Sequence, residues 1–478
     1  MGLARYYGPA PSSSRGARIR TGDLSLPKRA RYQPAPRPAT AHTSLVRCSL
    51  EVAMALVQAL KALHYDLQRT GGLEPVVAPP YDVIDDALRA RLESQSEYNV
   101  VKIDLPRASA DQPDIYANAA ATFTAWQQAG VVVHDQEGAI WPLEQDYTGP
   151  DGKPRTRRGF LARVRVEDYG PGKIRPHERT HPGPKEDRLR LTRATKANLS
   201  PIFSLYSDPE QKAWTALAAV MEPEPLATTT DLDGTVNRLW RVSDPEAISA
   251  VQAATAAAEL LIADGHHRYE TARVYAQEVE QQSGAEGEHD YVLMCLVALE
   301  DPGLTVFPTH RLIGGLDEAQ RSALWETIER HFEITELDSP QQLPPAANDQ
   351  LELGYMTAAE RRPYRLRLKD FTAVDELLAD RSQPYRRLDT AITEILLLKG
   401  ALGKSDDQID HFDGLWYARD DAEAINAVLE GEYDAALFMA PTPVSRVQDV
   451  AESGESMPPK STYFFPKVPT GLLFNPLA

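Results

Sequence analysis

The chain has 478 residues, of which 42% are hydrophobic and 25% charged, a composition typical of a globular protein with two or three domains. Only two cysteines, Cys48 and Cys295, are present, which excludes a disulfide framework or a cysteine-based metal site and favours the cytoplasm. The net charge of −18 disfavours nucleic-acid binding, which needs a basic surface. No run of 18 apolar residues occurs, so we expect no membrane-spanning segment.

Residues 1–53 differ in composition from the rest of the chain. They carry nine basic and two acidic residues and are rich in proline, so we expect this segment to be disordered. An organellar transit peptide would explain the arginines and serines but not the prolines. Residues 17–37 also resemble the peptides that result when an upstream transfer-RNA gene is translated conceptually, and in that interpretation the protein begins at Met54.

From Met54 onward, short apolar runs alternate with helical periods, which predicts an α+β or mixed α/β fold. The expected elements up to residue 166 are a proline-punctuated loop (73–84), a strand (100–105), a helix (116–129), two strands (131–133 and 138–141) and a half-exposed strand (158–166). A Gly-, Pro- and His-rich loop (170–184), a helix (185–196), a buried strand (259–263), a helix (269–281) and a strand (291–299) follow.

Beyond residue 315 the pattern predicts a second region. We expect a helix at 320–331, strands at 351–355 and 364–368, and a long helix at 390–398. The domain prediction is therefore an extension (1–53), a catalytic or nucleotide-binding region (54–315), and a C-terminal α/β region packed on it (316–478).

The segment from Leu261 to Ala272 (LIADGHHRYETA) carries the strongest chemical signal. An apolar strand runs into Asp264 and Gly265, and a helix then begins with His266, His267 and Arg268. Gly265 permits a tight turn and close approach of a ligand, and the N–H groups of a helix start attract anions. The sequence therefore predicts a phosphate-binding turn, in which Asp264 orients a histidine or holds a metal ion. The alternative is an N-cap with structural histidines.

A second candidate is the loop from Ile174 to Arg188 (IRPHERTHPGPKEDR). Glu178, beside His177, can act as general base for a hydroxyl nucleophile. Lys185 and Arg188 can pair with phosphate charge. The alternative is a solvated charged loop.

Weaker signals remain open. Thr309-His310-Arg311 either adds a basic group to a pocket or ends a strand, and Lys460-Ser461-Thr462 either lines a pocket or terminates the fold. The tail from Met457 to Lys467 is too patterned for a random terminus. His177, His181, His266 and His267 leave a metal site open.

Several motifs, in this order, resemble the family recorded as domain of unknown function 1015, from about residue 54 to 478. The matching segments are VAPPYDVI (77–84), PHE (176–178), GPKEDR (183–188), NLSP (198–201), DGHHRYETA (264–272), PTHR (308–311) and MPPKSTY (457–463).

The Pro-His-Glu loop and the Asp-Gly-His-His-Arg turn also resemble the free serine kinases of the ParB/sulfiredoxin superfamily. This resemblance implies a ParB/sulfiredoxin-like core with large insertions, in which residues 264–268 bind nucleotide phosphates and Glu178 acts on the substrate hydroxyl. The implied ligands are ADP or ATP with Mg²⁺ and a small hydroxylated metabolite, such as free serine.

Three functions follow as alternatives. The first is nucleotide-dependent phosphoryl transfer, with His177, Glu178 and Asp264 as catalytic residues. The second is a non-catalytic nucleotide-binding regulator, and the third is a metal-dependent hydrolase that uses the histidines. The sequence does not define the oligomeric state.

Overall fold

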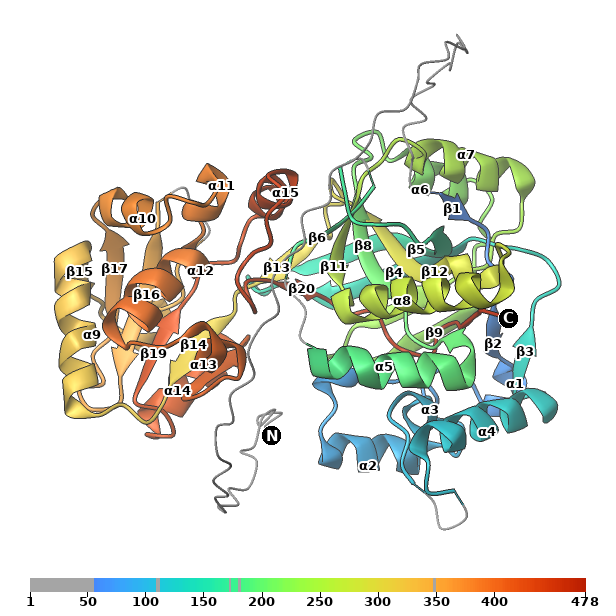
Figure 1. Ribbon diagram of the computed structural model, residues 1–478, viewed down its shortest axis with the longest axis horizontal. Helices are drawn as coiled ribbons and strands as arrows, with labels where there is room; N and C mark the ends of the chain where they lie inside the picture. Colours follow the sequence, from blue (N-terminus) through green and yellow to red (C-terminus); the bar gives the residue numbers. More distant parts are fainter. Residues whose placement is uncertain (1–55, 109–111, 172, 179–181, 347–349) are drawn as a thin grey trace, which may run out of the picture. The chain divides into compact units, whose positions relative to one another are not determined.

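The computed structural model describes residues 56–108, 112–171, 173–178, 182–346 and 350–478. The predictions for residues 1–53 and for His181 therefore lie outside the described residues. Helices and strands alternate along the unit from Ala53 to Ala478 (Figure 1), which confirms the mixed α/β class.

The larger sheet is mixed and has nine strands. Its order is β6-β11-β8-β12-β5-β4-β10-β9, and β1 pairs with β5. The pairs β6–β11 and β8–β12 are parallel, and the other pairs are antiparallel. The strands are β1 (Val57–Gln58), β4 (Trp141–Thr148), β5 (Pro154–Arg165), β6 (Ile174–Pro176), β8 (Ile202–Tyr206), β9 (Ala227–Thr230), β10 (Val236–Leu239), β11 (Leu260–Asp264) and β12 (Tyr291–Ala298).

Both faces of this sheet are buried. Alternate residues of a strand point to opposite faces, so Cys295 of β12 lies in one hydrophobic core and Met294 in the other. Residues of α6 (Lys212–Ala218), α7 (Pro245–Thr255) and α8 (His266–Ser283) cover the Met294 face. The Cys295 face is covered by segments before residue 133 and by residues of the C-terminal tail.

A second sheet lies within residues 310–438, and all of its pairs are antiparallel. Its order is β15-β17-β16-β19-β14-β18. The strands are β14 (His310–Ile313), β15 (Phe332–Glu336), β16 (Glu352–Thr357), β17 (Tyr364–Leu368), β18 (Leu415–Ala418) and β19 (Ala435–Phe438).

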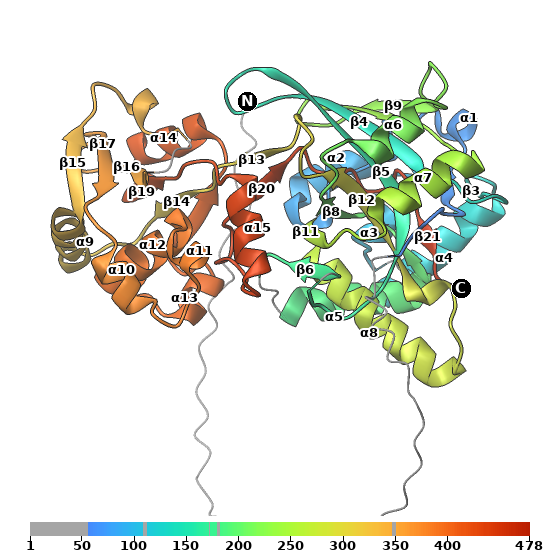
Figure 2. The same ribbon diagram turned by 90° about the horizontal axis from the view of Figure 1, so that it is seen from above.

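The last residues of the chain return from the second sheet to the first region. Strand β20 (Tyr463–Phe465) pairs with β13 (Thr305–Phe307), and β21 (Asn475–Pro476) pairs with β7 (Ala197–Asn198). Single bridges join Thr470 to Ala78 and Phe474 to Leu63. Figure 2 shows β20 beside β13. Residues far apart in the sequence therefore form one structure.

The remaining elements connect and cover these sheets. Strands β2 (Leu63–Tyr65) and β3 (Val132–His134) pair with each other. The other helices are α1 (Leu67–Thr70), α2 (Asp86–Gln95), α3 (Val101–Asp104), α4 (Ile115–Gln128), α5 (Pro182–Thr195), α9 (Glu318–His331), α10 (Thr372–Leu377), α11 (Gln383–Arg386), α12 (Asp389–Ile392), α13 (Asp406–Asp410), α14 (Asp421–Leu429) and α15 (Val444–Glu452). A π-helix (Thr393–Ala401) continues α12, and short 3₁₀ turns lie at Tyr81–Val83, Glu288–Asp290 and Pro340–Gln342.

The strand predicted at 100–105 is wrong, because this segment contains the short helix α3. The buried side chain of Asn99 accepts a hydrogen bond from Val101 N at 3.0 Å and donates to the carbonyls of Pro75 and Val77. It therefore stabilises a helical turn. A short apolar run cannot by itself distinguish a buried strand from a buried helical turn.

Two strand predictions need smaller corrections. The segment 158–166 is a strand, but Phe160, Leu161 and Ala162 are all buried, since β5 lies between β4 and β12. It is thus not half-exposed at its centre. The strands predicted at 131–133 and 138–141 belong to different sheets, as β3 and β4. By contrast, the elements expected at 259–263 and 269–281 lie within β11 and α8.

Candidate functional site

The two motifs singled out from the sequence meet at one edge of the larger sheet. Strands β6 and β11 are parallel, and Ile262 is the partner of Pro176. The chain leaves β6 into His177 and Glu178, and it leaves β11 into the turn at Gly265. Because the carboxyl ends of parallel strands lie at the same edge, the loop and the turn are brought together.

The turn requires glycine for two reasons. Gly265 has φ 91° and ψ 29°, in the left-handed region that L side chains rarely adopt. A Cβ at this position would also lie 2.9 Å from Arg268 Nε. The guanidinium therefore packs directly against the glycine. Gly265 is the N-cap of the 18-residue helix α8, and it has no side chain that could accept hydrogen bonds from the first turn. This residue therefore does not occupy the N–H groups at the positive end of the helix dipole.

Asp264 is held between two cations. One carboxylate oxygen accepts from Arg268 Nη2 at 2.5 Å, and the other accepts from Lys467 Nζ. Burial alone would raise the pKa of Asp264, but the charges of Lys467 and Arg268 outweigh burial and lower this pKa. For Lys467, burial would lower the pKa, yet the Asp264 charge raises it to about 12. All three groups therefore stay ionised, with a net charge of +1.

Arg268 also anchors the turn to the connection between β7 and β8. Its Nη1 donates to Ser200 Oγ at 2.6 Å and to the carbonyl of Pro201. Its Nε has no hydrogen-bond partner among the described residues. The contacts of Nη1 and Nη2 thus fix the guanidinium in position.

The two histidines at the site have assignable hydrogen-bonding roles. His266 Nε2 is near the backbone N–H groups of His177 (3.3 Å) and Glu178 (3.4 Å), so it accepts from both and carries no proton. Burial and the neighbouring His177 lower the pKa of His266 to about 3, so this ring stays neutral. His177 Nδ1 lies 2.5 Å from the Ile262 carbonyl, which can only accept, so Nδ1 carries a hydrogen.

Glu178 lies beside His177 and the C-terminal tail. Its side chain is 20% exposed and its Oε1 is 3.5 Å from His177 Nε2. Thr462 donates to this oxygen from its backbone N at 3.4 Å and approaches it with Oγ1 at 3.2 Å. Burial alone would raise the pKa of Glu178, but the hydrogen bond and charge of His177 outweigh burial and lower the pKa to about 2. The carboxylate is therefore ionised at neutral pH.

The other predicted ligand-binding residues lie on α5 and α8. Arg188 is buried and donates to the Asp104 carbonyl (2.8 Å) and to Asp187 Oδ2 (2.6 Å), with its guanidinium 4.4 Å from the centre of the Tyr81 ring. These contacts hold the Pro79-Pro80-Tyr81 segment in place. Lys185 is half-buried and 3.8 Å from Glu270. His267 is half-buried at the start of α8.

Two side chains of the site were not predicted, although both lie in the tail. Thr462 was named only within a segment that could line a pocket, and Lys467 only as the end of the tail. The mixture of polar and aromatic residues between Met457 and Lys467 was the sequence feature that could have indicated a role for this segment in the site. The tail is fixed there by further contacts: Met457 N donates to the His177 carbonyl at 2.7 Å, and the hydroxyls of Ser461 and Thr390 are hydrogen-bonded to each other at 3.0 Å.

The donor set does not fit a metal ion at Asp264. Both carboxylate oxygens already accept from cations, and a divalent ion would have to lie beside two positive charges. Within the described ranges, no group of three or more His, Cys, Asp or Glu side chains could hold a metal ion. His181, one of the four histidines considered for a metal-dependent hydrolase, lies outside those ranges.

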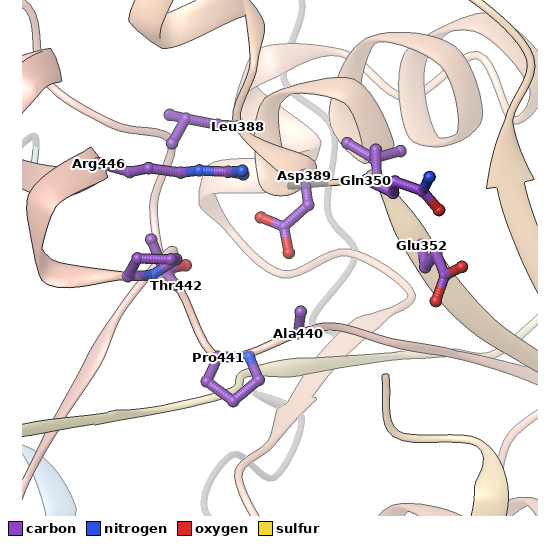
Figure 3. A pocket seen from close by; sticks show the side chains of 10 residues that line it. Gln350, Glu352, Leu388, Asp389, Ala440, Pro441, Thr442 and Arg446 are labelled. Carbon is purple, nitrogen blue, oxygen red and sulfur yellow. The ribbon is translucent and has the colours of Figure 1, made fainter. Parts of the chain in front are cut away.

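A separate pocket lies in the C-terminal region and is distinct from this site. It is lined by Leu388, Asp389, Thr442, Arg446 and neighbouring residues, and Figure 3 shows the Asp389 carboxylate turned into it. Its volume is about 20 Å³, which is enough for a water molecule and too small for a metabolite. Burial raises the pKa of Asp389.

Comparisons with known proteins place the chain in a family. The model of the family described as "Protein of unknown function (DUF1015)" matches residues 57–391, well over half of the chain, and the protein belongs to this family. A search of the curated proteins gave no match. No helix in the described residues is long and apolar enough to cross a membrane.

Solved structures give only remote likenesses. A conserved hypothetical protein from Pyrococcus furiosus is 13% identical, with a TM-score of 0.32 and coverage of 65% of this chain and 95% of that chain. A free serine kinase in complex with AMP is 13% identical, with a TM-score of 0.32 and coverage of 65% of this chain and 92% of that chain. C-terminally truncated SbnI from Staphylococcus aureus is 12% identical, with a TM-score of 0.28 and coverage of 66% of this chain and 87% of that chain. Scores of this size do not establish a common fold, so the function proposed below rests on the site's own residues.

Proposed function

We propose that the protein transfers a phosphoryl group from a nucleotide, ADP or ATP, to a small hydroxylated metabolite such as free serine. The observation that carries this proposal is the pairing of an ionised carboxylate, Glu178, with a glycine turn that holds two fixed cations, Arg268 and Lys467. The first group can orient a hydroxyl, and the second set can hold phosphate oxygens.

The phosphate side of the proposal is supported by electrostatics. Helix α8 begins at the turn, and its N-terminus carries about half a positive charge. Arg268 and Lys467 add two full charges, of which Asp264 neutralises one. Asp264 therefore positions the two cations and does not serve as a metal ligand. Charge-assisted hydrogen bonds to phosphate are about twice as strong as neutral ones.

The acceptor side depends on Glu178. A carboxylate whose pKa is about 2 is ionised throughout the working pH range, so it can always accept a hydrogen bond from a substrate hydroxyl. In the loose transition state of phosphoryl transfer, the attacking oxygen is poorly bonded to phosphorus and loses its proton late. A weak base that fixes the direction of the hydroxyl is therefore sufficient. No step is assigned to a metal ion, since Asp264 does not fit one.

One observation favours the alternative of a nucleotide-binding protein that performs no transfer. Glu178 Oε1 already has the backbone and side chain of Thr462 within hydrogen-bonding distance. A carboxylate used only to hold the tail would have the same contacts. In that case the nucleotide would bind at the turn while Glu178 anchored residues 457–467.

Binding and transfer are tested separately on the full chain. Calorimetric titration with ADP and ATP should show binding that Arg268→Ala weakens ~10–100-fold, the loss expected for a charge-assisted hydrogen bond. Arg273→Ala is the matched control, because Arg273 lies on the same helix and pairs with Asp168 at the surface. No binding of either nucleotide by the wild-type protein would refute the proposal.

Transfer is measured by ³¹P NMR with nucleotide and L-serine or other small hydroxylated metabolites. Glu178→Gln should lose ~10²–10⁴-fold in turnover, the usual contribution of a positioned base, and should keep its nucleotide affinity. Nucleotide binding without transfer to any acceptor would favour the regulatory alternative.

A further inference from the structure

We propose that Arg157, a buried arginine to which no carboxylate is bonded, adds positive charge to the site at Asp264 and Lys467 and makes it select phosphate ligands of high charge, the di- and triphosphates. This inference rests on the proposed function, because it concerns the anion that the turn would hold. Arg157 lies on β5 and is 1% exposed. The proposed role is electrostatic and needs no contact between Arg157 and the ligand.

The guanidinium of Arg157 has only a neutral hydrogen-bond partner. Its Nε donates to Gln145 Oε1 at 3.1 Å, and its Nη2 donates to the same oxygen. Its Nη1 is buried and has no hydrogen-bond partner among the described residues. The face of the Phe203 ring, whose centre is 4.4 Å from the guanidinium carbon, is a weaker partner than a carboxylate. Because arginine stays protonated in proteins, a full positive charge is buried here with no carboxylate bonded to it in the part of the chain that the structure describes.

The acidic groups that act on Arg157 from a distance compensate this charge only in part. Burial lowers the pKa of Arg157, and Cys295, Tyr147, Asp301 and Asp264 oppose that effect. Burial raises the pKa of Cys295 to about 12 and raises that of Tyr147 as well, so both groups are neutral at pH 7. Burial also raises the pKa of Asp301, which favours its neutral form. Asp264 is already paired with two other cations.

Arg157 is connected to the site through the same two side chains that it contacts. Gln145, whose side-chain oxygen is held by Arg157, donates from Nε2 to the backbone carbonyl of Lys467 at 3.1 Å. Phe203 is the partner of Asp264 in the pairing of β8 with β11. One side chain therefore separates the guanidinium from the backbone of Lys467, and another connects it to the strand beside Asp264. In a protein interior, a unit charge acts over such a separation more strongly than it would in water.

The cost of this arrangement indicates its purpose. A buried charge without an ion pair destabilises a folded protein, and a bound anion would supply the missing negative charge. Arg157 would then be a third positive charge beside Arg268 and Lys467. Because the Coulomb energy is proportional to the charge of the ligand, this third charge favours a triphosphate over a diphosphate and a diphosphate over a monophosphate.

The inference is tested on the full chain with Arg157→Met, which removes the charge and keeps a long side chain, and with Arg157→Lys, which keeps the charge. Calorimetric titrations use inorganic phosphate, pyrophosphate and tripolyphosphate, followed by ADP and ATP. We expect Arg157→Met to weaken pyrophosphate binding ~10-fold, phosphate binding less and tripolyphosphate binding more. Arg157→Lys should retain most of the affinity. Arg158→Met is the matched control that should leave these affinities unchanged, because Arg158 is the next residue of β5, is 44% exposed and pairs with Glu144 at 3.1 Å.

The stability of the unliganded protein separates an electrostatic role from a structural one. Arg157→Met removes an uncompensated buried charge, which offsets the loss of two hydrogen bonds to Gln145. We therefore expect the urea midpoint to stay at or above that of wild type. Arg188→Met is the contrasting case, since Arg188 is paired with Asp104 at 3.1 Å and its loss leaves a buried carboxylate. A midpoint that Arg157→Met lowers as far as Arg188→Met does would overturn the inference.

The outcomes for this inference and for the proposed function are distinct. Equal weakening of all the anions in Arg157→Met, no weakening at all, or an equally large loss in Arg157→Lys would each overturn the role of the Arg157 charge. Nucleotide binding by the wild type would still leave the kinase proposal intact in those cases. Pyrophosphate binding that Arg157→Met weakens, without binding of either nucleotide by the wild type, would support the role of Arg157 and refute the proposed function. A wild-type protein that binds none of these anions would refute both.

Discussion

The substitution Lys467→Met removes one cation from the Asp264 carboxylate and leaves a side chain of similar length. Both members of the pair are 15% exposed, so the interaction is only weakly screened by solvent. The Asp264 charge raises the pKa of Lys467 from 10.5 to about 12. A rise of about 1.5 pH units corresponds to about 2 kcal/mol. The loss stays below the 3–5 kcal/mol of a fully uncompensated buried charge, because Arg268 still neutralises Asp264.

We therefore expect Lys467→Met to lower the free energy of unfolding by about 2 kcal/mol at pH 7, measured by urea denaturation with tryptophan fluorescence. Asp264→Asn and the double variant complete a cycle whose interaction energy should be of the same size. Lys153→Met is the surface control. Its lysine is 78% exposed and 3.7 Å from Asp151, so the change should stay below about 0.5 kcal/mol.

The pH dependence tests the same reasoning. Because the pKa of Lys467 is raised on folding, its contribution is complete below the unfolded value of 10.5 and is lost as pH rises through about 12. Because the pKa of Asp264 is lowered on folding, its contribution is present above 3.8 and is lost at lower pH. The difference between wild type and Lys467→Met should thus be constant between about pH 5 and 9 and shrink outside this range. If the free energies of unfolding of wild type and Lys467→Met differ by less than about 0.5 kcal/mol at pH 7, the pair contributes no more than an exposed ion pair, and the expected stabilisation by Lys467 is refuted.

Three further predictions concern the same edge of the sheet. His266 should remain neutral down to about pH 4 in NMR titrations, since its pKa is about 3; this depressed pKa means that stability falls as pH drops below the unfolded value of 6.5. Gly265→Ala should destabilise the protein more than Gly284→Ala in urea and weaken nucleotide binding, because both glycines have positive φ but only the first would bring a Cβ to 2.9 Å from another side chain. Arg188→Met should leave Asp104 as a buried unpaired carboxylate and cost ~3–5 kcal/mol by the same denaturation measurement.

The sequence was sufficient for the local geometry of the turn. An apolar run, an acid, a glycine and a helical period define β11, Gly265 and α8, because all of the forces involved act between near neighbours in the chain. The same reasoning failed at α3, where the deciding contact is the hydrogen bond from Asn99 to segments more than 20 residues away. Apolar residues at 100–105 are compatible with either structure until that contact is known.

Side chains from the tail could not be assigned to the site from sequence. Thr462 and Lys467 reach Glu178 and Asp264 only because β20 pairs with β13 and Thr470 bridges to Ala78. Those pairings depend on where the second sheet ends, which no local pattern reveals. The polar character of residues 457–467 indicated that the segment could line a pocket. The side chains that it contacts, Glu178 and Asp264, lie more than 200 residues away in the sequence.

The tail also changes how the turn itself should be understood. From sequence, Asp264 was the reactive group and the cations were its neighbours; a metal ion or an oriented histidine was the expected partner. With Lys467 and Arg268 on its two oxygens, Asp264 is already paired with two cations, and a metal ion bound there would lie beside both positive charges. Its negative charge instead lowers the cost of burying two cations at a helix N-terminus. A site built in this way attracts an anion, and Glu178, held a few ångströms from the start of the same helix, is the group positioned to act on what that anion brings.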